Sequence, residues 1–286
     1  MTSASIIAPV SRTAAVDVDD TNLANAPRNP KRAARPAYAM RALGRYDLPT
    51  EFRLGDVVWR YTFTVKHDFY ACTGFYADDQ GNKAVLKMGR AADFGGFSLE
   101  WLGRILCLRE MRFYNKLSDL PNVPKVLGTV GRTGFVHEYV EGRPLSKKRP
   151  VPDGFFAQLF DLLDELHRRH IAYVDTNKPE NILLGDDGRP HLIDFQISWD
   201  LSGVGRGWWL NRVILRVLQR EDLYHVRKHH KRLRPDELTP EQMKQAEHIS
   251  PWIKLHRVVT RPFKRIRRRT LQRMRDAGQL LPEGSK

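Results

Sequence analysis

The chain has 286 residues, of which 41% are hydrophobic, and a formal net charge of +15. This length suits one two-lobed domain or two small domains, and the composition is that of a globular protein. No apolar run reaches the roughly 18 residues of a membrane-spanning helix, no signal peptide is evident, and two cysteines, Cys72 and Cys107, imply neither a disulfide framework nor a zinc site. A reducing cytoplasm fits these features best.

The first half of the chain predicts a tail followed by short strands. Residues 1–45 are rich in Ala, Pro, Thr and Arg without a regular period, which predicts disorder. Three antiparallel strands are expected over 57–65, 69–76 and 83–88, the last two joined by a Gly-Asn turn. Lys87 lies in the third strand. The turn between the first two, Lys66 to Phe69, contains no glycine.

A helix and a further strand pair follow. The helix is expected over 99–117, and a strand pair over 125–130 and 135–140 precedes an amphipathic helix over 155–170. The first helix carries two candidate acids, Glu100 and Glu110. Its apolar residues predict one buried stripe, made of Leu102, Ile105, Leu106, Leu108, Met111, Tyr114 and Leu117.

Residues 173–199 hold polar side chains at the ends of short strands. A loop leads into a strand over 182–184, a tight turn at Asp186 to Pro190, and a strand over 191–193 that runs into Asp194. Asp175 and Asn181 lie in the loop. A carboxylate that accepts a hydroxyl proton and two oxygen ligands for Mg²⁺ are what phosphoryl transfer requires.

This stretch resembles the catalytic and metal loops of the protein-kinase superfamily. The sequence KPENILL, starting at Lys178, is followed thirteen residues after Asn181 by Asp194-Phe195. The resemblance implies an α+β, two-lobed fold with a small antiparallel β N-lobe bearing one helix and a mainly helical C-lobe. It implies ATP and Mg²⁺ as cofactors, Asp175 as catalytic base, Lys178 as γ-phosphate neutraliser, and Asn181 and Asp194 as metal ligands.

The same resemblance assigns roles in the N-lobe. Lys87 would reach the α- and β-phosphates of ATP, with Glu110 as its partner and Glu100 as the competing candidate. Backbone groups from Glu138 to Val140 would hold the adenine, with His137 beside them. Lys66 or His67 would neutralise phosphate by side chain, since the turn lacks glycine.

Several features depart from the eukaryotic pattern. Tyr173-Val174 replaces His-Arg, Asp175 and Asn181 are six residues apart where five is usual, Gln196 replaces a glycine, and no Ala-Pro-Glu motif follows. The chain is in this respect more similar to an atypical bacterial branch that includes RIO-like and lipopolysaccharide-core (heptose and Kdo) sugar kinases. The expected domains are a tail (1–45), an N-lobe with hinge (46–140), a C-lobe (141–235) and a basic helical extension (236–286).

The positive charge is concentrated at the C-terminal end. From Gly203 onward there are 21 lysines and arginines against 8 acidic residues. A helix over 208–220 carries Trp208, Trp209 and three arginines, which suits either a membrane surface or a C-lobe core helix with a basic edge. A polyanionic partner is therefore expected: acidic lipid at the inner face of the cytoplasmic membrane or, less favoured, nucleic acid.

The sequence thus predicts a kinase that uses Mg-ATP to phosphorylate a hydroxyl. The acceptor would be a protein serine or threonine, or a lipopolysaccharide or lipid-linked sugar, at a membrane surface. The alternative is a non-catalytic kinase-like scaffold that binds acidic lipid or nucleic acid through its basic C-terminal region.

Overall fold

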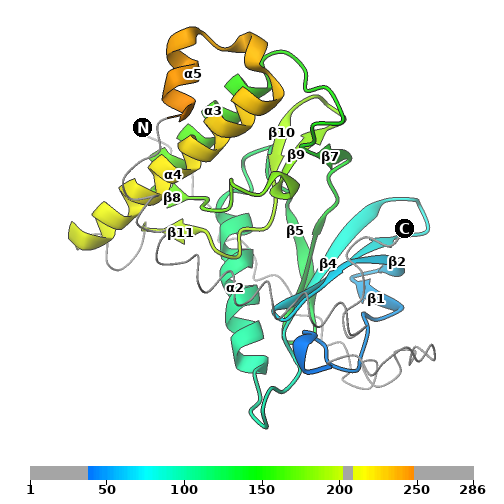
Figure 1. Ribbon diagram of the computed structural model, residues 1–286. Coiled ribbons are helices and arrows are strands. Elements are labelled where there is room, and N and C mark those ends of the chain that lie inside the picture. Colours follow the sequence, from blue (N-terminus) through cyan, green and yellow to red (C-terminus); the bar gives the residue numbers. More distant parts are fainter. Residues whose placement is uncertain (1–37, 202–208, 248–286) are drawn as a thin grey trace, which may run out of the picture.

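The computed structural model describes residues 38–201 and 209–247 (Figure 1). A β-rich lobe with one helix lies beside a mainly helical lobe, and the chain passes between them after residue 138. No helix in these two ranges is long and apolar enough to cross a membrane. The α+β class and the two-lobed arrangement that the sequence predicts are confirmed.

The N-lobe is a six-stranded antiparallel sheet in the order β1-β2-β3-β4-β6-β5. The predicted strands form, and a short strand at its edge, β1, was not predicted. Fully buried residues alternate with partly buried ones along most of β3, since one face of the sheet covers a core around Tyr76 and Leu86. The strands are β1 (Glu51–Leu54), β2 (Val57–His67), β3 (Ala71–Ala77), β4 (Lys83–Gly89), β5 (Val126–Val130) and β6 (Gly134–Glu138).

Helix α2 (Glu100–Lys116) packs against β4, and its predicted buried stripe is partly wrong. Ile105 and Leu108 are exposed, whereas Cys107 and Glu110 are buried. The cause is a close crossing at Gly103, where a Cβ would stand 1.9 Å from the carbonyl oxygen of Arg90. Only glycine permits this approach, and it turns the Cys107–Glu110 side of the helix inward.

The C-lobe contains helices α3 (Phe155–Arg168) and α4 (Trp209–Leu233), which pack side by side (Figure 1). The predicted hairpin is present as β9 (Ile182–Gly185) and β10 (Pro190–Leu192), with Gly188 at φ 78° in its turn. The remaining short elements are η1 (Tyr38–Met40), β7 (Gly142–Pro144), β8 (Ile171–Ala172), η2 (Pro179–Asn181), β11 (Trp199–Asp200), η3 (Pro235–Glu237) and α5 (Pro240–Glu247).

Helix α4 is longer than predicted. The expected end near Arg220 is wrong because no glycine or proline interrupts the chain between residues 209 and 234, and the helix continues to Leu233. Its second half is a core helix, with Asp222 and Val226 fully buried, while the arginines of its first half are exposed. Trp208 lies outside the described residues.

Both ends of the described chain are tied to the fold. Ala42 and Leu43 are buried, so the packed N-lobe begins before residue 46, and residues 1–37 lie outside the described residues. At the other end, Thr239 and Gln242 form a reciprocal capping box for α5, at 2.9 Å and 3.3 Å. Beyond residue 247 the predicted basic extension also lies outside the described residues.

Candidate active site

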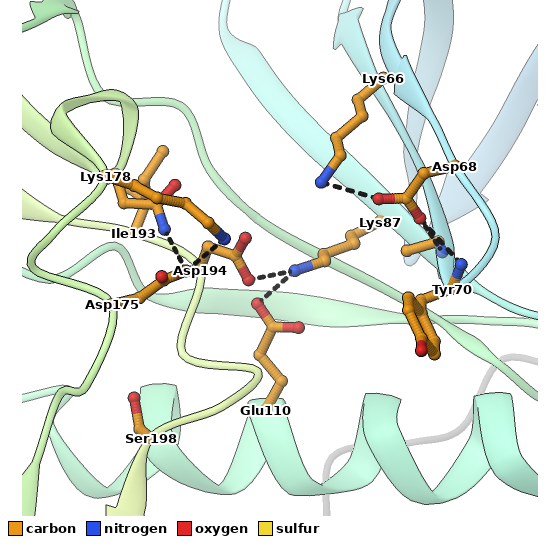
Figure 2. A network of polar contacts seen from close by, with 12 residues as sticks. Lys66, Asp68, Tyr70, Lys87, Glu110, Asp175, Lys178, Ile193, Asp194 and Ser198 are labelled. Carbon is orange, nitrogen blue, oxygen red and sulfur yellow. Dashed lines mark hydrogen bonds and ion pairs between the residues drawn. The ribbon is translucent and has the colours of Figure 1, made fainter. Parts of the chain in front are cut away.

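Three charged side chains meet where the two lobes face each other (Figure 2). Lys87 Nζ lies 2.7 Å from Glu110 Oε1 and 2.8 Å from Asp194 Oδ1. Lys87 comes from β4, Glu110 from α2 and Asp194 from the segment after β10, so this network joins three elements. The prediction that Glu110 faces Lys87 agrees with this geometry. Glu100 instead pairs with Arg132, at 3.1 Å.

Burial decides the charges of this network. Burial alone would lower the pKa of Lys87, but the carboxylates of Glu110 and Asp194 outweigh it and raise the pKa. Burial raises the pKa of Glu110 to about 7, although Lys87 opposes this. For Asp194, the ammonium of Lys87 outweighs burial and lowers the pKa to about 2. The network therefore favours the charged forms of Lys87 and Asp194, whereas burial opposes the charge of Glu110.

A second polar cluster surrounds Asp175. Lys178 Nζ lies 2.6 Å from Asp175 Oδ2, and Asn181 Nδ2 donates to the same oxygen at 2.8 Å (Figure 2 shows the Lys178 contact). The extra residue between Asp175 and Asn181 does not separate them, because Thr176 is turned inward and buried. The lengthened loop thus still brings its carboxylate, ammonium and amide together.

A residue that sequence reasoning missed holds this loop. The buried carboxylate of Asp222, on α4, accepts hydrogen bonds from the backbone N–H groups of Tyr173 and Val174, both at 2.8 Å, and from Thr176 Oγ1 at 3.2 Å. Val174 adopts φ 72°, a left-handed conformation that is rare for a β-branched residue. The only available signal was an acidic residue inside a long basic helix.

Asp194 is positioned by its own backbone and by its neighbour. It adopts φ 63°, and its N–H donates to the hydroxyl of Tyr114 at 3.0 Å. Phe195 is fully buried and its ring contacts those of Tyr114 and Tyr173, with centroids 5.1 Å apart in both cases. This packing directs the Asp194 carboxylate toward Lys87. Gln196, in the place of a glycine, borders a small void beside Lys87 and Glu110.

The turn between β2 and β3 is held by hydrogen bonds to the carboxylate of Asp68. Asp68 Oδ1 accepts the backbone N–H groups of Tyr70 and Ala71, at 2.8 Å and 2.9 Å. Its other oxygen lies 2.8 Å from Lys66 Nζ, and Figure 2 shows this pair on the Lys87 side of the sheet. The turn therefore does without glycine because Asp68 satisfies its N–H groups. His67 instead contacts Arg41, through Nδ1 at 2.9 Å.

The predicted hinge joins β6 to the C-lobe. The carbonyl oxygen of Glu138 lies 2.8 Å from His137 Nδ1, and burial lowers the pKa of His137 to about 4. A neutral His137 therefore donates to a carbonyl in the segment, Glu138 to Val140, that the resemblance assigns to adenine. Glu138 and Val140 also border a cavity of about 270 Å³ on the side of the β9–β10 turn, but Lys87, Asp175 and Asp194 do not line it.

The residues present fit a magnesium ion. Asn181 uses its amide nitrogen toward Asp175, which leaves its oxygen available, and Asp194 has one carboxylate oxygen beyond the one at Lys87. Mg²⁺ is commonly held by one or two protein oxygens together with phosphates and water. A site with three or more His, Cys, Asp or Glu ligands is absent from the part of the chain that the structure describes.

Comparisons with known proteins point to kinases over short segments. No protein-family model matches the chain. The Aurora kinase of Schizosaccharomyces pombe is 32% identical over 85 residues, which is 30% of this chain and 23% of that kinase. Two kinases of Arabidopsis thaliana are similar: serine/threonine-protein kinase UCN, 34% identical over 110 residues and 27% of its length, and serine/threonine-protein kinase OXI1, 30% identical over 92 residues and 22% of its length. They cover 32% and 29% of this chain.

Solved kinase structures are also similar. The Rio2 kinase from Chaetomium thermophilum is 18% identical with a TM-score of 0.48, over 70% of this chain and 64% of that chain. Its ADP/Mg²⁺-phosphoaspartate complex is 18% identical with a TM-score of 0.46, over 71% of this chain and 60% of that chain. The chain thus spans about a quarter of the curated kinases and less than two thirds of the Rio2 kinase.

The protein-kinase-like fold follows from the architecture itself. An antiparallel sheet with one helix supplies Lys87 and Glu110, and the C-lobe hairpin supplies Asp194 across the junction between the lobes. This is the arrangement that the sequence motif predicted.

Proposed function

We propose that this chain is a phosphotransferase that moves the γ-phosphoryl group of Mg-ATP to a hydroxyl. One observation carries the proposal: three elements from both lobes bring Lys87, Glu110 and Asp194 into direct contact beside Asp175. Burying charged side chains is costly unless each charge is paired. The fold alone therefore has no structural need for this set of residues. Phosphoryl transfer needs such a set to position phosphates and neutralise charge.

Each residue has a chemical task in this proposal. The acceptor oxygen forms a bond to the γ-phosphorus, the bond from that phosphorus to the β–γ bridging oxygen breaks, and ADP leaves. Asp175 takes the proton of the acceptor hydroxyl, and Lys178 offsets negative charge on the transferred group. Lys87, fixed by Glu110, holds the non-transferred phosphates. Asn181 and Asp194 would hold Mg²⁺, which when bound neutralises phosphate charge.

The proposal also concerns the molecule that carries the acceptor hydroxyl. A hydroxyl on a lipid-linked or lipopolysaccharide sugar at the inner face of the cytoplasmic membrane agrees with the positive charge that begins at Gly203, because anionic lipid would concentrate the enzyme there. A serine or threonine of a protein is the other acceptor. The bacterial sugar-kinase branch remains a prediction.

The test compares the wild-type protein with Asp175→Asn and Asp194→Asn. Titration calorimetry with Mg-ATP measures binding, and release of ADP measures turnover. We expect the wild type to bind and turn over ATP, Asp175→Asn to bind without turnover, and Asp194→Asn to lose the Mg²⁺ dependence of binding. A wild type that binds no nucleotide in the presence of Mg²⁺ would sink the proposal.

A non-catalytic scaffold is the second candidate, and the β2–β3 turn favours it. Asp68 already occupies the N–H groups of Tyr70 and Ala71, which in a glycine-rich loop would be directed at phosphate. A scaffold predicts that neither Mg-ATP binding nor ADP release depends on Asp175 or Asp194, and the same set of variants measures both.

A further inference from the structure

The outward face of α2 is apolar although it is exposed. Trp101, Ile105 and Leu108 are 60%, 53% and 52% exposed. Their spacing places them in one row along the helix, opposite Cys107 and Glu110, which face inward. Single exposed apolar residues are common on protein surfaces, but a continuous row marks an interaction surface.

The row continues beyond the start of the helix. Phe94 and Phe97 form a β-bridge across Gly95 and Gly96, whose φ angles are 59° and 83°. This tight turn projects past the end of α2 (Figure 1), and Phe97 is 76% exposed. Phe97 comes just before α2 and Trp101 lies in its first turn, so an exposed phenyl and an exposed indole are both near the N-terminal end of the row.

The charge of this face is positive. Arg104 and Arg112 are exposed and flank the apolar row. The carboxylates of residues 94–116 are engaged elsewhere, because Glu100 pairs with Arg132 at 3.1 Å and Glu110 is buried against Lys87. An apolar row with arginines at its edges is what a lipid headgroup layer favours, since the rings enter the interface and the arginines meet phosphate.

We propose that this docking face binds the surface of an anionic lipid bilayer. It comprises Phe97, Trp101, Arg104, Ile105, Leu108 and Arg112. The first turns of α4 have the same chemistry, with Trp209 and Val213 exposed beside Arg216. Two copies of the docking face would oppose arginine with arginine, so charge argues against self-association. The inference rests on the exposed apolar and arginine side chains of α2, and it does not depend on catalytic activity.

A local probe tests the proposal without interference from the basic residues beyond Glu247. Ile105→Cys is labelled with an environment-sensitive dye, which is selective because Cys72 and Cys107 are buried. Gln80→Cys, in the exposed β3–β4 turn, is the matched control. Both full-length proteins are titrated with phosphatidylcholine vesicles that contain or lack phosphatidylglycerol.

We expect the dye at position 105 to shift to the blue on anionic vesicles only, and the dye at position 80 not to change. Co-sedimentation without a change at position 105 would overturn the proposal, because other basic residues would then account for binding. A shift that follows protein concentration without vesicles would overturn it in favour of a second copy of the chain.

A pair of unlabelled variants measures affinity. We expect Trp101→Ser/Ile105→Ser/Leu108→Ser to weaken partitioning into anionic vesicles by about tenfold or more, since three apolar side chains no longer leave water. Val57→Ser/Phe63→Ser/Val65→Ser removes an equal number of exposed apolar side chains from β2 and should leave partitioning unchanged. Equal loss in both variants would contradict the assignment to α2. Circular dichroism checks that both remain folded.

Discussion

The carboxylate of Asp175 is under two opposing influences. Burial raises its pKa above that of an ordinary aspartate, while the hydrogen bond and charge of Lys178 lower it, and burial prevails. Asp175 is therefore a stronger base than an exposed aspartate, which suits a group that takes a proton from a hydroxyl. Turnover is lost as pH falls through this raised pKa, because protonated Asp175 accepts no proton.

Replacing Lys178 with methionine should move the acid limb of turnover to higher pH. Removing the ammonium takes away the contact that lowers the pKa of Asp175, so the carboxylate protonates at a higher pH than in the wild type. The measurement is kcat/KM for Mg-ATP as a function of pH. Lys178→Arg keeps the positive charge and should leave the limb near its wild-type position. A limb that moves to lower pH in Lys178→Met would contradict the assignment.

Lys66 and Asp68 give a second prediction, about nucleotide affinity. Asp68→Asn keeps an oxygen for the turn N–H groups but releases Lys66 from its ion pair, so Lys66 becomes free to meet phosphate. We expect Mg-ATP affinity to rise by up to about fivefold, the range of an exposed ion pair. Lys66→Met should lower it by a similar factor.

Adenosine is the control ligand for this pair of variants. It lacks phosphate, so titration calorimetry should give the same adenosine affinity for Asp68→Asn, Lys66→Met and the wild type. If Mg-ATP affinity is also the same in all three proteins, Lys66 does not contact the nucleotide, and its predicted role is wrong.

At the scale of elements, α4 holds the catalytic loop in place through Asp222. Asp222→Asn should lower the free energy of unfolding by about 1–3 kcal/mol, because a buried charged acceptor of three hydrogen bonds is lost. Turnover should fall more than Mg-ATP affinity, since Lys87 and Glu110 are not touched by the change. Denaturant unfolding and calorimetry measure the two effects.

Asp161→Asn, an exposed carboxylate on α3, is the control for Asp222→Asn. It should change neither the unfolding free energy nor turnover. If Asp222→Asn behaves in the same way, Asp222 does not position the loop.

The elements show which parts of the site could be predicted. Asp175, Lys178 and Asn181 lie in one short motif, so their spacing in the sequence was enough. Asp222 lies on another element. The residues around it in the sequence do not indicate that two backbone N–H groups of the loop donate to its carboxylate. The buried side of α2 was wrong for a related reason, because Gly103 lets the backbone of Arg90 approach and this contact overrides the apolar pattern.

At the scale of the whole molecule, the hydrophobic cores do not follow the two lobes. Phe113 and Tyr114 of α2 belong to the same core as Leu159 of α3 and Phe195, whereas the sheet around Tyr76 has a core of its own. We expect α2 to open together with α3, and the β2–β3 hairpin to open independently at lower free energy.

Native-state hydrogen exchange in rising denaturant measures this difference. Backbone amides of α2 and α3 should share one opening free energy, above that of β2. If α2 and β2 share one opening free energy and α3 has a different one, the units that open together follow the lobes and not the hydrophobic cores.

Val174 has a consequence for engineering this protein. A β-branched residue at φ 72° costs about 1–3 kcal/mol, and the hydrogen bond to Asp222 holds it there. Val174→Gly would relieve that strain and, unlike most valine-to-glycine changes, should cost little stability. The same change would loosen the segment that leads into Asp175. Selection for heat resistance would therefore tolerate Val174→Gly, whereas selection for turnover would remove it, so stability and activity are in conflict at this position.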